Sequence, residues 1–151
     1  MTAATRLAEL GVSLPAVAAP LAAYVPAVRT GNLVYTSGQL PLAGGELIRT
    51  GKVGAEVSPE DAKAAARTCA LNALAAIDAL VGIDSVVRVV KVVGFVASSP
   101  GFSGQPGVVN GASEFLGEVF GEAGSHARSA VGVSELPLDA PVEVELIVEV
   151  V

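Results

Sequence analysis

The sequence contains few of the residues that build metal centres, disulfides and aromatic surfaces. Its 151 residues include one cysteine, one histidine and no tryptophan, and aromatic residues make up 4% of the chain. A single cysteine excludes an intramolecular disulfide, and Cys69 and His126 alone cannot supply the ligands of a structural zinc site. No carboxylate motif typical of a metal site is present either. We therefore expect no bound metal and a reducing, cytoplasmic location.

Charged residues are also scarce, and those present are mainly acidic. Only 16% of the residues are charged, 52% are hydrophobic, and the net charge is -6. Proteins that bind nucleic acids usually present a basic face, so this balance argues against a DNA or RNA partner. The hydrophobic share exceeds what a domain of this length covers by folding alone, because small domains bury a limited fraction of their surface. We expect a homo-oligomer whose interfaces cover the excess.

One long uncharged stretch near the N-terminus is interrupted by proline. Residues 10–28 have no charged side chain, but Pro15, Pro20 and Pro26 would break a membrane-spanning helix. The first residues lack the pattern of a signal peptide. We expect residues 1–23 to form an extended arm, with a short helical turn near its start, lying across the domain or a neighbouring subunit. Residues 24–151 are expected to form a single domain.

Alternation, turn residues and helical spacing predict the element order β-β-β-α-β-α-β-β. The expected strands span residues 27–29, 33–37, 47–49, 86–97, 130–133 and 142–150. One expected helix begins at Ser58-Pro59 and runs to about Val81, and a second begins at Pro106. The simplest packing is an α+β fold with two helices on one face of a mixed, six-stranded sheet. Solvent or partner subunits would then cover the other face.

Arg128 is the strongest candidate for a functional residue. It opens an apolar strand, and the last strand carries Glu143 and Glu145 at alternate positions, so both glutamates point to one face. A permanently charged guanidinium among Val and Ala is costly unless an anion pairs with it. That anion is either one of the glutamates, bracing two strands, or the carboxylate of a small ligand. The residues alone leave both interpretations open.

The lone histidine and the lone cysteine are assigned structural roles. Cys69 lies on the apolar stripe of the first long helix, where a small buried hydrophobe is expected. His126 has no nucleophile beside it in a recognised motif, and such a histidine is more often structural than catalytic. Tyr24 lies between Pro20 and Pro26, directly after the arm, and we expect it to reach a pocket or a neighbouring subunit.

Several short motifs occur in an order that resembles a known family. They are Tyr24-Val25-Pro26, Thr36-Ser37-Gly38-Gln39-Leu40-Pro41, Asn110, Ala127-Arg128-Ser129 and Val142-Glu143-Val144-Glu145. Together they resemble the Rid family, the reactive intermediate deaminases, which are also called YjgF- or RidA-like proteins and carry the older label endoribonuclease L-PSP. The resemblance extends from residue 24 to residue 150, and the longer arm is similar to that of a side branch of the family.

The resemblance implies a chorismate-mutase-like fold, a homotrimer and ligand sites in clefts between subunits. It also implies hydrolysis of 2-imino acids, derived from enamines, to 2-oxo acids and ammonia without a cofactor. The implied catalytic residues are Arg128, which binds the substrate carboxylate, and Glu143, which positions water. The implied substrate-binding residues are Tyr24, Ser37, Gly38, Asn110 and Ala130.

Two positions depart from the family pattern. Ala130 stands where the deaminase branch usually has cysteine, and His126 stands where proline is common. The alternative function is therefore a non-catalytic protein of the same fold that binds small carboxylates through Arg128. An endoribonuclease, suggested by the older label, is a distant third because the chain lacks a basic patch with interleaved aromatic residues.

Overall fold

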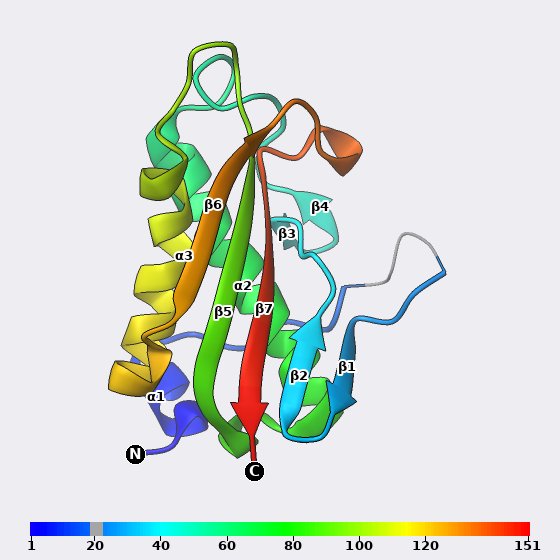
Figure 1. The fold of residues 1–151 in the computed structure, drawn as a ribbon, viewed down its shortest axis with the longest axis vertical. Helices are drawn as coiled ribbons and strands as arrows, with labels where there is room; N and C mark the ends of the chain where they lie inside the picture. The colour runs from blue at the N-terminus through cyan, green and yellow to red at the C-terminus, as the bar shows by residue number, and fades with distance from the viewer. Residues whose placement is uncertain (19–22) are drawn as a thin grey trace.

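The computed structural model of this chain describes residues 1–18 and 23–151. Its helices and strands, with 3-10 helices written η, are α1 (Ala3–Glu9), β1 (Ala27–Thr30), β2 (Leu33–Thr36), β3 (Leu42–Ala43), β4 (Glu46–Leu47), α2 (Pro59–Val81), η1 (Ile83–Ser85), β5 (Val86–Ala97), α3 (Gln105–Phe120), η2 (Gly121–Gly124), β6 (Ala127–Val133), η3 (Pro137–Asp139) and β7 (Val142–Val150). Figure 1 shows their arrangement. The arm expected over residues 1–23 includes residues 19–22, which lie outside the described part.

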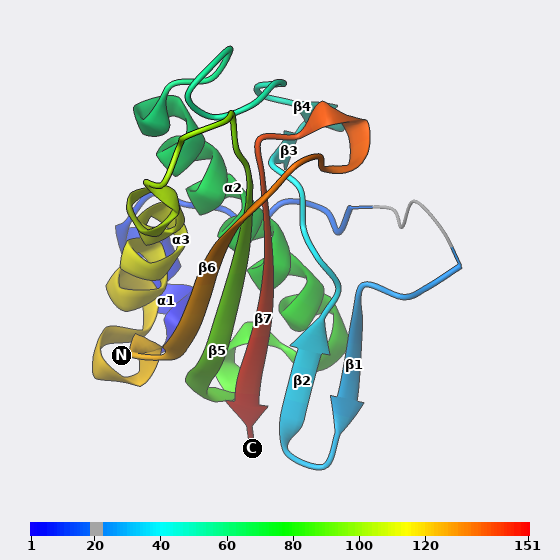
Figure 2. The same cartoon turned by 45° about the horizontal axis from the view of Figure 1, so that its top comes forward.

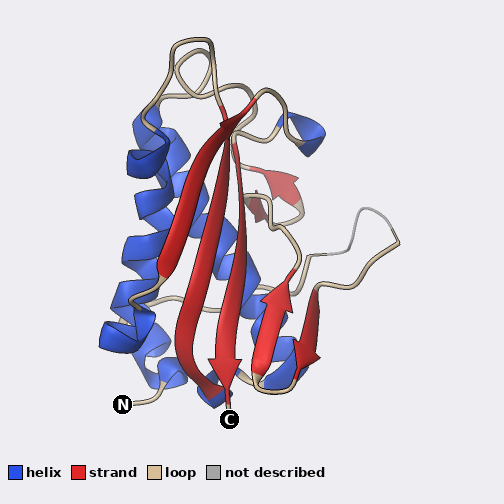
Figure 3. Ribbon diagram, in the orientation of Figure 1, coloured by secondary structure: helices blue, strands red, loops and turns tan. Residues whose placement is uncertain are grey.

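Five strands form the main sheet, in the order β1-β2-β7-β5-β6. Neighbouring strands are antiparallel except β5 and β6, which run parallel and are connected through α3. The long helices α2 and α3 lie together on one face of this sheet, as Figures 1 and 3 show. The predicted α+β fold, with two long helices on one face of a mixed sheet, is confirmed. Because a parallel connection needs a crossover, α3 is held against the edge formed by β5 and β6.

The predicted strand count of the main sheet is wrong by one. The third expected strand, residues 47–49, was expected in a six-stranded sheet, but β4 pairs with β3 in a separate two-stranded sheet. Gly44 and Gly45 both have positive φ, 63° and 84°. Two such residues make a tight hairpin turn, which folds β4 back onto β3 and away from the main sheet. In Figure 2 this small hairpin and η3 lie at the same end of the molecule.

Helix α2 begins and ends at the predicted residues. The Ser58 hydroxyl accepts a hydrogen bond from the Asp61 N–H at 3.1 Å, and Pro59 occupies the first turn. Gly82, with φ of 83°, ends the helix and donates its N–H to the Asp78 carbonyl at 2.9 Å. Local capping chemistry therefore fixes both ends of the helix.

The first residues of the predicted arm form a docked helix. α1 is capped by the Thr2 hydroxyl, and Leu7 is buried in the common core. The Arg6 Nε–H donates to the Glu118 carbonyl of α3 at 2.8 Å. This part of the arm is more helical than expected, because a buried leucine and a capping threonine stabilise about two turns of helix.

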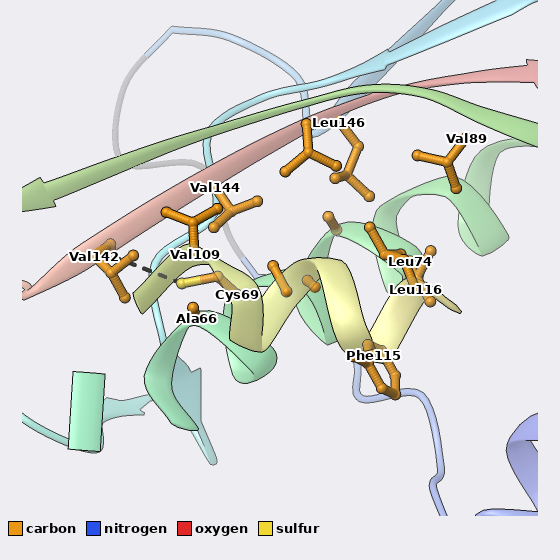
Figure 4. Packing of buried hydrophobic residues seen from close by; sticks show 14 of the residues in the cluster. Ala66, Cys69, Leu74, Val89, Val109, Phe115, Leu116, Val142, Val144 and Leu146 are labelled. Atoms are coloured by element: carbon orange, nitrogen blue, oxygen red, sulfur yellow. Dashed lines mark hydrogen bonds between the residues drawn. The ribbon is translucent and has the colours of Figure 1, made fainter. Parts of the chain in front are cut away.

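The core lies between the sheet and its two helices. Figure 4 shows apolar side chains of α2, α3, β5 and β7 packed together, with Cys69 among them. Cys69 is fully buried, and its thiol donates to the Val142 carbonyl at 3.7 Å. Burial raises the pKa of this thiol well above its usual value, and the charge of Glu143 raises it further. The predicted structural role of Cys69 is confirmed.

Helix α2 is long and apolar enough to cross a membrane by length and composition alone. In the described residues, however, 56% of the most apolar 18-residue segment of this helix is buried inside the protein. The small side chains of this helix are what allow the close packing against the sheet, since Ala62, Ala66, Ala70 and Ala73 are all fully buried. The hydropathy of α2 therefore reflects its place in the core.

Among residues 1–18 and 23–151, no long helix covers the other face of the sheet, and this face is partly apolar. Val28 and Tyr35 are partners in register on β1 and β2, and Phe95 and Val131 are partners on β5 and β6. Of these, Val28, Tyr35 and Val131 are between 42% and 52% exposed. An apolar sheet face of this kind is typical of a surface that a partner covers.

The close packing of α3 on α2 depends on the absence of a side chain at Gly111. A Cβ placed there would overlap the Lys63 carbonyl oxygen and lie 2.9 Å from the carbonyl carbon. We expect Gly111→Ala to lower the free energy of unfolding by roughly 1–3 kcal/mol, because the helix backbones must separate. Gly117→Ala, on the same helix with nothing within 4 Å, should instead raise it by about 0.5–1 kcal/mol. Urea denaturation measures both, and equal effects would contradict this packing.

Candidate functional site

A cavity of about 330 Å³ lies beside the loop that follows β2. Its walls come from that loop, from the end of the arm, from β7 and from η3. The lining residues are Ala18, Tyr24, Pro26, Ser37, Gly38, Gln39, Leu40, Leu42, Pro137 and Glu143. Four predicted site residues, Tyr24, Ser37, Gly38 and Glu143, are therefore brought together in one chain. The sequence did not single out Gln39 or Pro137 as lining residues.

Backbone hydrogen bonds fix the loop on one side of this cavity. The Ser37 N–H donates to the Pro26 carbonyl at 2.8 Å, and the Ser37 hydroxyl donates to the Val25 carbonyl at 2.6 Å. Gln39 and Val144 exchange backbone hydrogen bonds of 2.8 and 3.0 Å, which join the loop to β7. The polar groups of the cavity are thus carried by a rigid framework.

The Glu143 carboxylate lies directly over Gly38. A Cβ at Gly38 would overlap Oε2 of Glu143 and lie 2.8 Å from its Cδ, so any side chain there would move the carboxylate from this position. Burial raises the pKa of Glu143 above its ordinary value, and the charge of Glu145 raises it further. A carboxyl with a raised pKa accepts and returns a proton more readily near neutral pH, as general acid–base chemistry requires.

Arg128 lies elsewhere in the chain, on the helix-covered side of edge strand β6. It pairs in register with the buried Val92 of β5, and its guanidinium reaches toward α3. Nη1 donates to the Asn110 amide oxygen at 2.8 Å and to the Ser113 hydroxyl at 3.2 Å, while Nη2 is 3.4 Å from the Pro106 carbonyl. Across residues 1–18 and 23–151, no carboxylate forms an ion pair with this guanidinium.

The sheet order excludes the strand-bracing ion pair. β5 lies between β6 and β7, so the strand carrying Arg128 does not neighbour the strand carrying Glu143 and Glu145 (Figure 1). Side chains paired in register share a face, and Arg128 is paired with the helix-facing Val92. Glu143 alternates with the buried Val142 and Val144 and therefore points to the opposite face. Among the residues that the structure describes, the charge of Arg128 thus has no carboxylate partner.

The predicted site residues therefore form two separate groups. Asn110 and Ala130 accompany Arg128, because Ala130 pairs with Gly94 on the helix-covered side. Arg128 and Glu143 are two strands and about three residues apart, which is roughly 14 Å between Cα atoms for ordinary strand spacings. One small acid cannot contact both groups within a single chain.

Sequence reasoning missed Ser113, which contacts both Arg128 and His126. Its hydroxyl is 3.2 Å from Nη1 of Arg128 and 2.9 Å from Nε2 of His126. Ser113 follows Asn110 by three residues on α3, so the two side chains share one helix face. That spacing is the signal that would have found it once Asn110 was assigned. In the described part of the chain, no group of three or more His, Cys, Asp or Glu residues could hold a metal ion.

The chain is similar to several known proteins. Residues 4–150 match the protein family described as "YjgF/chorismate_mutase-like, putative endoribonuclease". The chain is 47% identical over 148 residues to Protein TCP17 of Trypanosoma cruzi, covering 97% of this chain and 92% of that protein. It is 46% identical to Atu1372, a protein of unknown function from Agrobacterium tumefaciens with a crystal structure. The two structures superpose with a TM-score of 0.92, and the match covers 99% of this chain and 92% of Atu1372. The chain is also similar to E. coli TdcF, whose crystal structure was determined with bound serine. The sequence identity is 26%, the TM-score is 0.66, and the match covers 91% of this chain and 94% of TdcF.

Because the pKa of Glu143 is raised in the folded protein, ionisation of its carboxyl should lower the free energy of unfolding. The folded protein favours the protonated carboxyl, so stability falls as pH rises from the ordinary glutamate range through the raised folded value. We expect Glu143→Gln to raise the Tm at pH 8, and the gain to shrink at pH 4. Because the side chain is only half-buried, screening limits the gain to about 1 kcal/mol, or roughly 2–4 °C for a domain of this size.

Glu149→Gln is the matched control for this measurement. Glu149 lies on the same strand and the same face, but its partner in register is the cationic Arg88, whereas that of Glu143 is Phe95. Thermal denaturation followed by circular dichroism gives each Tm. A Glu143→Gln protein that is less stable than the parent at pH 8 would contradict the assigned burial of the charge.

Proposed function

Because this chain belongs to the YjgF/chorismate mutase-like family, we propose that it is a cofactor-independent hydrolase that converts small 2-imino acids into 2-oxo acids and ammonia. The observation that carries the proposal is the Arg128 guanidinium, which has no carboxylate partner among the described residues. Arginine binds a carboxylate through two parallel hydrogen bonds, and every 2-imino acid offers one. We assign the activity to the cytoplasm, in keeping with the single, unpaired cysteine.

We further propose that the complete site forms between copies of the chain in a homotrimer. The Arg128 group and the Glu143 group lie on opposite sides of one sheet, so a second copy is needed to bring them together. The exposed Val28, Tyr35 and Val131 give the uncovered sheet face an apolar surface suited to such contacts. Residues 24–151 would supply the trimeric domain, and the arm over residues 1–23 would contribute one wall, since Ala18 lines the cavity.

The proposed reaction needs positioning and proton transfer only. Arg128 of one copy binds the substrate carboxylate, while Tyr24 and the backbone around Ser37-Gly38 of another copy enclose the imine end. A water oxygen adds to the imine carbon as Glu143 accepts a proton from that water. Glu143 passes this proton to the imine nitrogen, which gives a carbinolamine. The carbinolamine hydroxyl then gives its proton to the nitrogen through Glu143 as the C–N bond breaks, so ammonia leaves and the carbon keeps the water oxygen as the carbonyl of the 2-oxo acid. Fixing these groups in one cleft lowers the entropic part of the barrier.

A second candidate function is binding of small amino or oxo acids without turnover. The related E. coli TdcF structure contains bound serine, which carries the same carboxylate group. In this chain Arg128 and Asn110 would bind such a carboxylate equally well without any reaction. Calorimetry that shows binding of 2-oxobutyrate, together with no acceleration of ammonia release from imines, would select this function.

Ribonuclease activity receives less support, although the family description contains the word endoribonuclease. The net charge of -6 disfavours a phosphate backbone, which needs a basic surface.

Removing the Arg128 guanidinium should abolish efficient hydrolysis. We expect Arg128→Ala to lower kcat/KM for 2-iminopropanoate roughly 100-fold, as the loss of a bidentate charge-assisted contact predicts. Arg49→Ala is the control, because Arg49 forms an exposed pair with Asp61. The assay measures ammonia released from imines that an amino-acid oxidase generates in situ. Hydrolysis by Arg128→Ala at the parent rate would contradict the proposal.

A site shared between copies predicts complementation between two inactive proteins. Arg128→Ala and Glu143→Gln subunits, unfolded together and refolded as a 1:1 mixture, should recover about a quarter of the parent activity. In a randomly mixed cyclic trimer, about one interface in four joins an intact Arg128 to an intact Glu143. Each protein refolded alone is the control. A mixture no more active than the two proteins alone would show that both residues do not serve one site from different chains.

A further inference from the structure

A continuous chain of hydrogen bonds connects His126, Ser113 and Arg128. His126 lies between η2 and β6, and its Nδ1 is 2.6 Å from the Gly124 carbonyl oxygen. Its Nε2 is 2.9 Å from the Ser113 hydroxyl, which is itself 3.2 Å from Nη1 of Arg128. The side chains therefore link the turn before β6, the middle of α3 and the guanidinium.

The direction of every hydrogen bond in this chain follows from chemistry. A carbonyl oxygen can only accept, so Nδ1 of His126 carries a hydrogen and donates it to Gly124. A neutral imidazole has one N–H, so Nε2 must accept, and the Ser113 hydroxyl donates to it. The lone pairs of Ser113 then remain to accept from Nη1 of Arg128. Because the Ser113 hydroxyl gives its hydrogen to His126, its oxygen lone pairs are left to accept from the guanidinium.

These bonds also decide which edge of the guanidinium meets a ligand. Both hydrogens of Nη1 are used, one by Asn110 and one by Ser113. Nη2 has one long contact, with the Pro106 carbonyl at 3.4 Å, and Nε has no hydrogen-bond partner among the described residues. The edge formed by Nε and Nη2 therefore remains available for the two oxygens of a carboxylate.

We propose that Ser113 and His126 are positioning residues that hold Arg128 with its Nε–Nη2 edge presented to the substrate carboxylate. This inference rests on the proposed function, because it concerns the orientation of the same arginine. A long arginine side chain loses considerable rotamer freedom when it binds, and restraint before binding lowers that cost. The effect therefore falls on substrate affinity, while the groups that transfer protons are untouched.

Steady-state kinetics and binding test the proposal. Ser113→Ala and His126→Phe should each raise KM for 2-iminopropanoate, and Kd for 2-oxobutyrate, about three- to tenfold, with kcat changed less than about twofold. Ser113→Thr keeps the hydroxyl and His126→Gln keeps an acceptor near the position of Nε2, so both should restore affinity. Glu114→Gln is the control, because Glu114 neighbours Ser113 on α3 and pairs only with the exposed Lys63.

This experiment separates two claims, namely that Arg128 binds the carboxylate and that Ser113 and His126 position Arg128. If Arg128→Ala loses 2-oxobutyrate binding while Ser113→Ala and His126→Phe bind it like the parent, the positioning role is overturned and the proposed carboxylate site stands. If Arg128→Ala itself binds 2-oxobutyrate like the parent, both claims fail. Loss of affinity in Ser113→Ala with recovery in Ser113→Thr supports the positioning role.

The tautomer of His126 gives a readout that does not depend on activity. The chain has one histidine, so the ¹⁵N spectrum of its imidazole contains a single ring. At pH 8.5 we expect the Nδ1–H tautomer, with Nε2 in the range of an unprotonated nitrogen, and a shift of the Nε2 resonance in Ser113→Ala. An Nε2–H tautomer would overturn the proposal, because Nε2 would then donate to Ser113 and would no longer fix the direction of the serine hydroxyl hydrogen.

Discussion

The position of β5 between β6 and β7 is the constraint on which this account depends. It places Arg128 and Glu143 on strands that do not touch and on opposite faces of one sheet. The sheet therefore prevents the two charges from neutralising each other within a chain. A fold in which β6 and β7 were neighbours would allow an internal ion pair and leave no cation for a ligand.

The two groups of candidate site residues are held by different hydrogen bonds. Near the cavity, the loop after β2 is hydrogen-bonded to Val25 and Pro26, just before β1, and to β7, and Gly38 leaves room for a carboxylate whose ionisation burial disfavours. Near β6, the arginine is held by two side chains of α3. Placing a half-buried carboxyl against the sheet destabilises the fold slightly, and the dense packing of α2 and α3 on the sheet offsets that cost.

Local features of the sequence predicted much of the fold. The Ser58-Pro59 start and Gly82 end of α2 follow from capping chemistry, and the strict alternation of β7 placed Glu143 and Glu145 on one face. The third strand was misplaced because residues 47–49 are apolar enough for a sheet, whereas the Gly44-Gly45 turn decides which strand they meet. The family resemblance located most of the candidate site residues. It could not show that a single chain separates them, because strand order arises from contacts distant in sequence.

Residues that act through others were the hardest to predict. Ser113 has no motif, and its role appears only when α3 is seen against β6. His126 was assigned a structural role on chemical grounds, and its bond to Ser113 could be found only from the three-dimensional arrangement. Such contacts depend on a parallel crossover that brings residues thirteen or more positions apart onto one surface.

The most direct test of the central claim is a crystal structure of the protein grown with 2-oxobutyrate. The account predicts a trimer in which each ligand carboxylate is bound by Arg128 of one copy while its 2-oxo carbon faces Glu143 of a neighbouring copy. A ligand bound by Arg128 with Glu143 of every copy remote from it, or a protein that is monomeric at working concentration, would contradict the account.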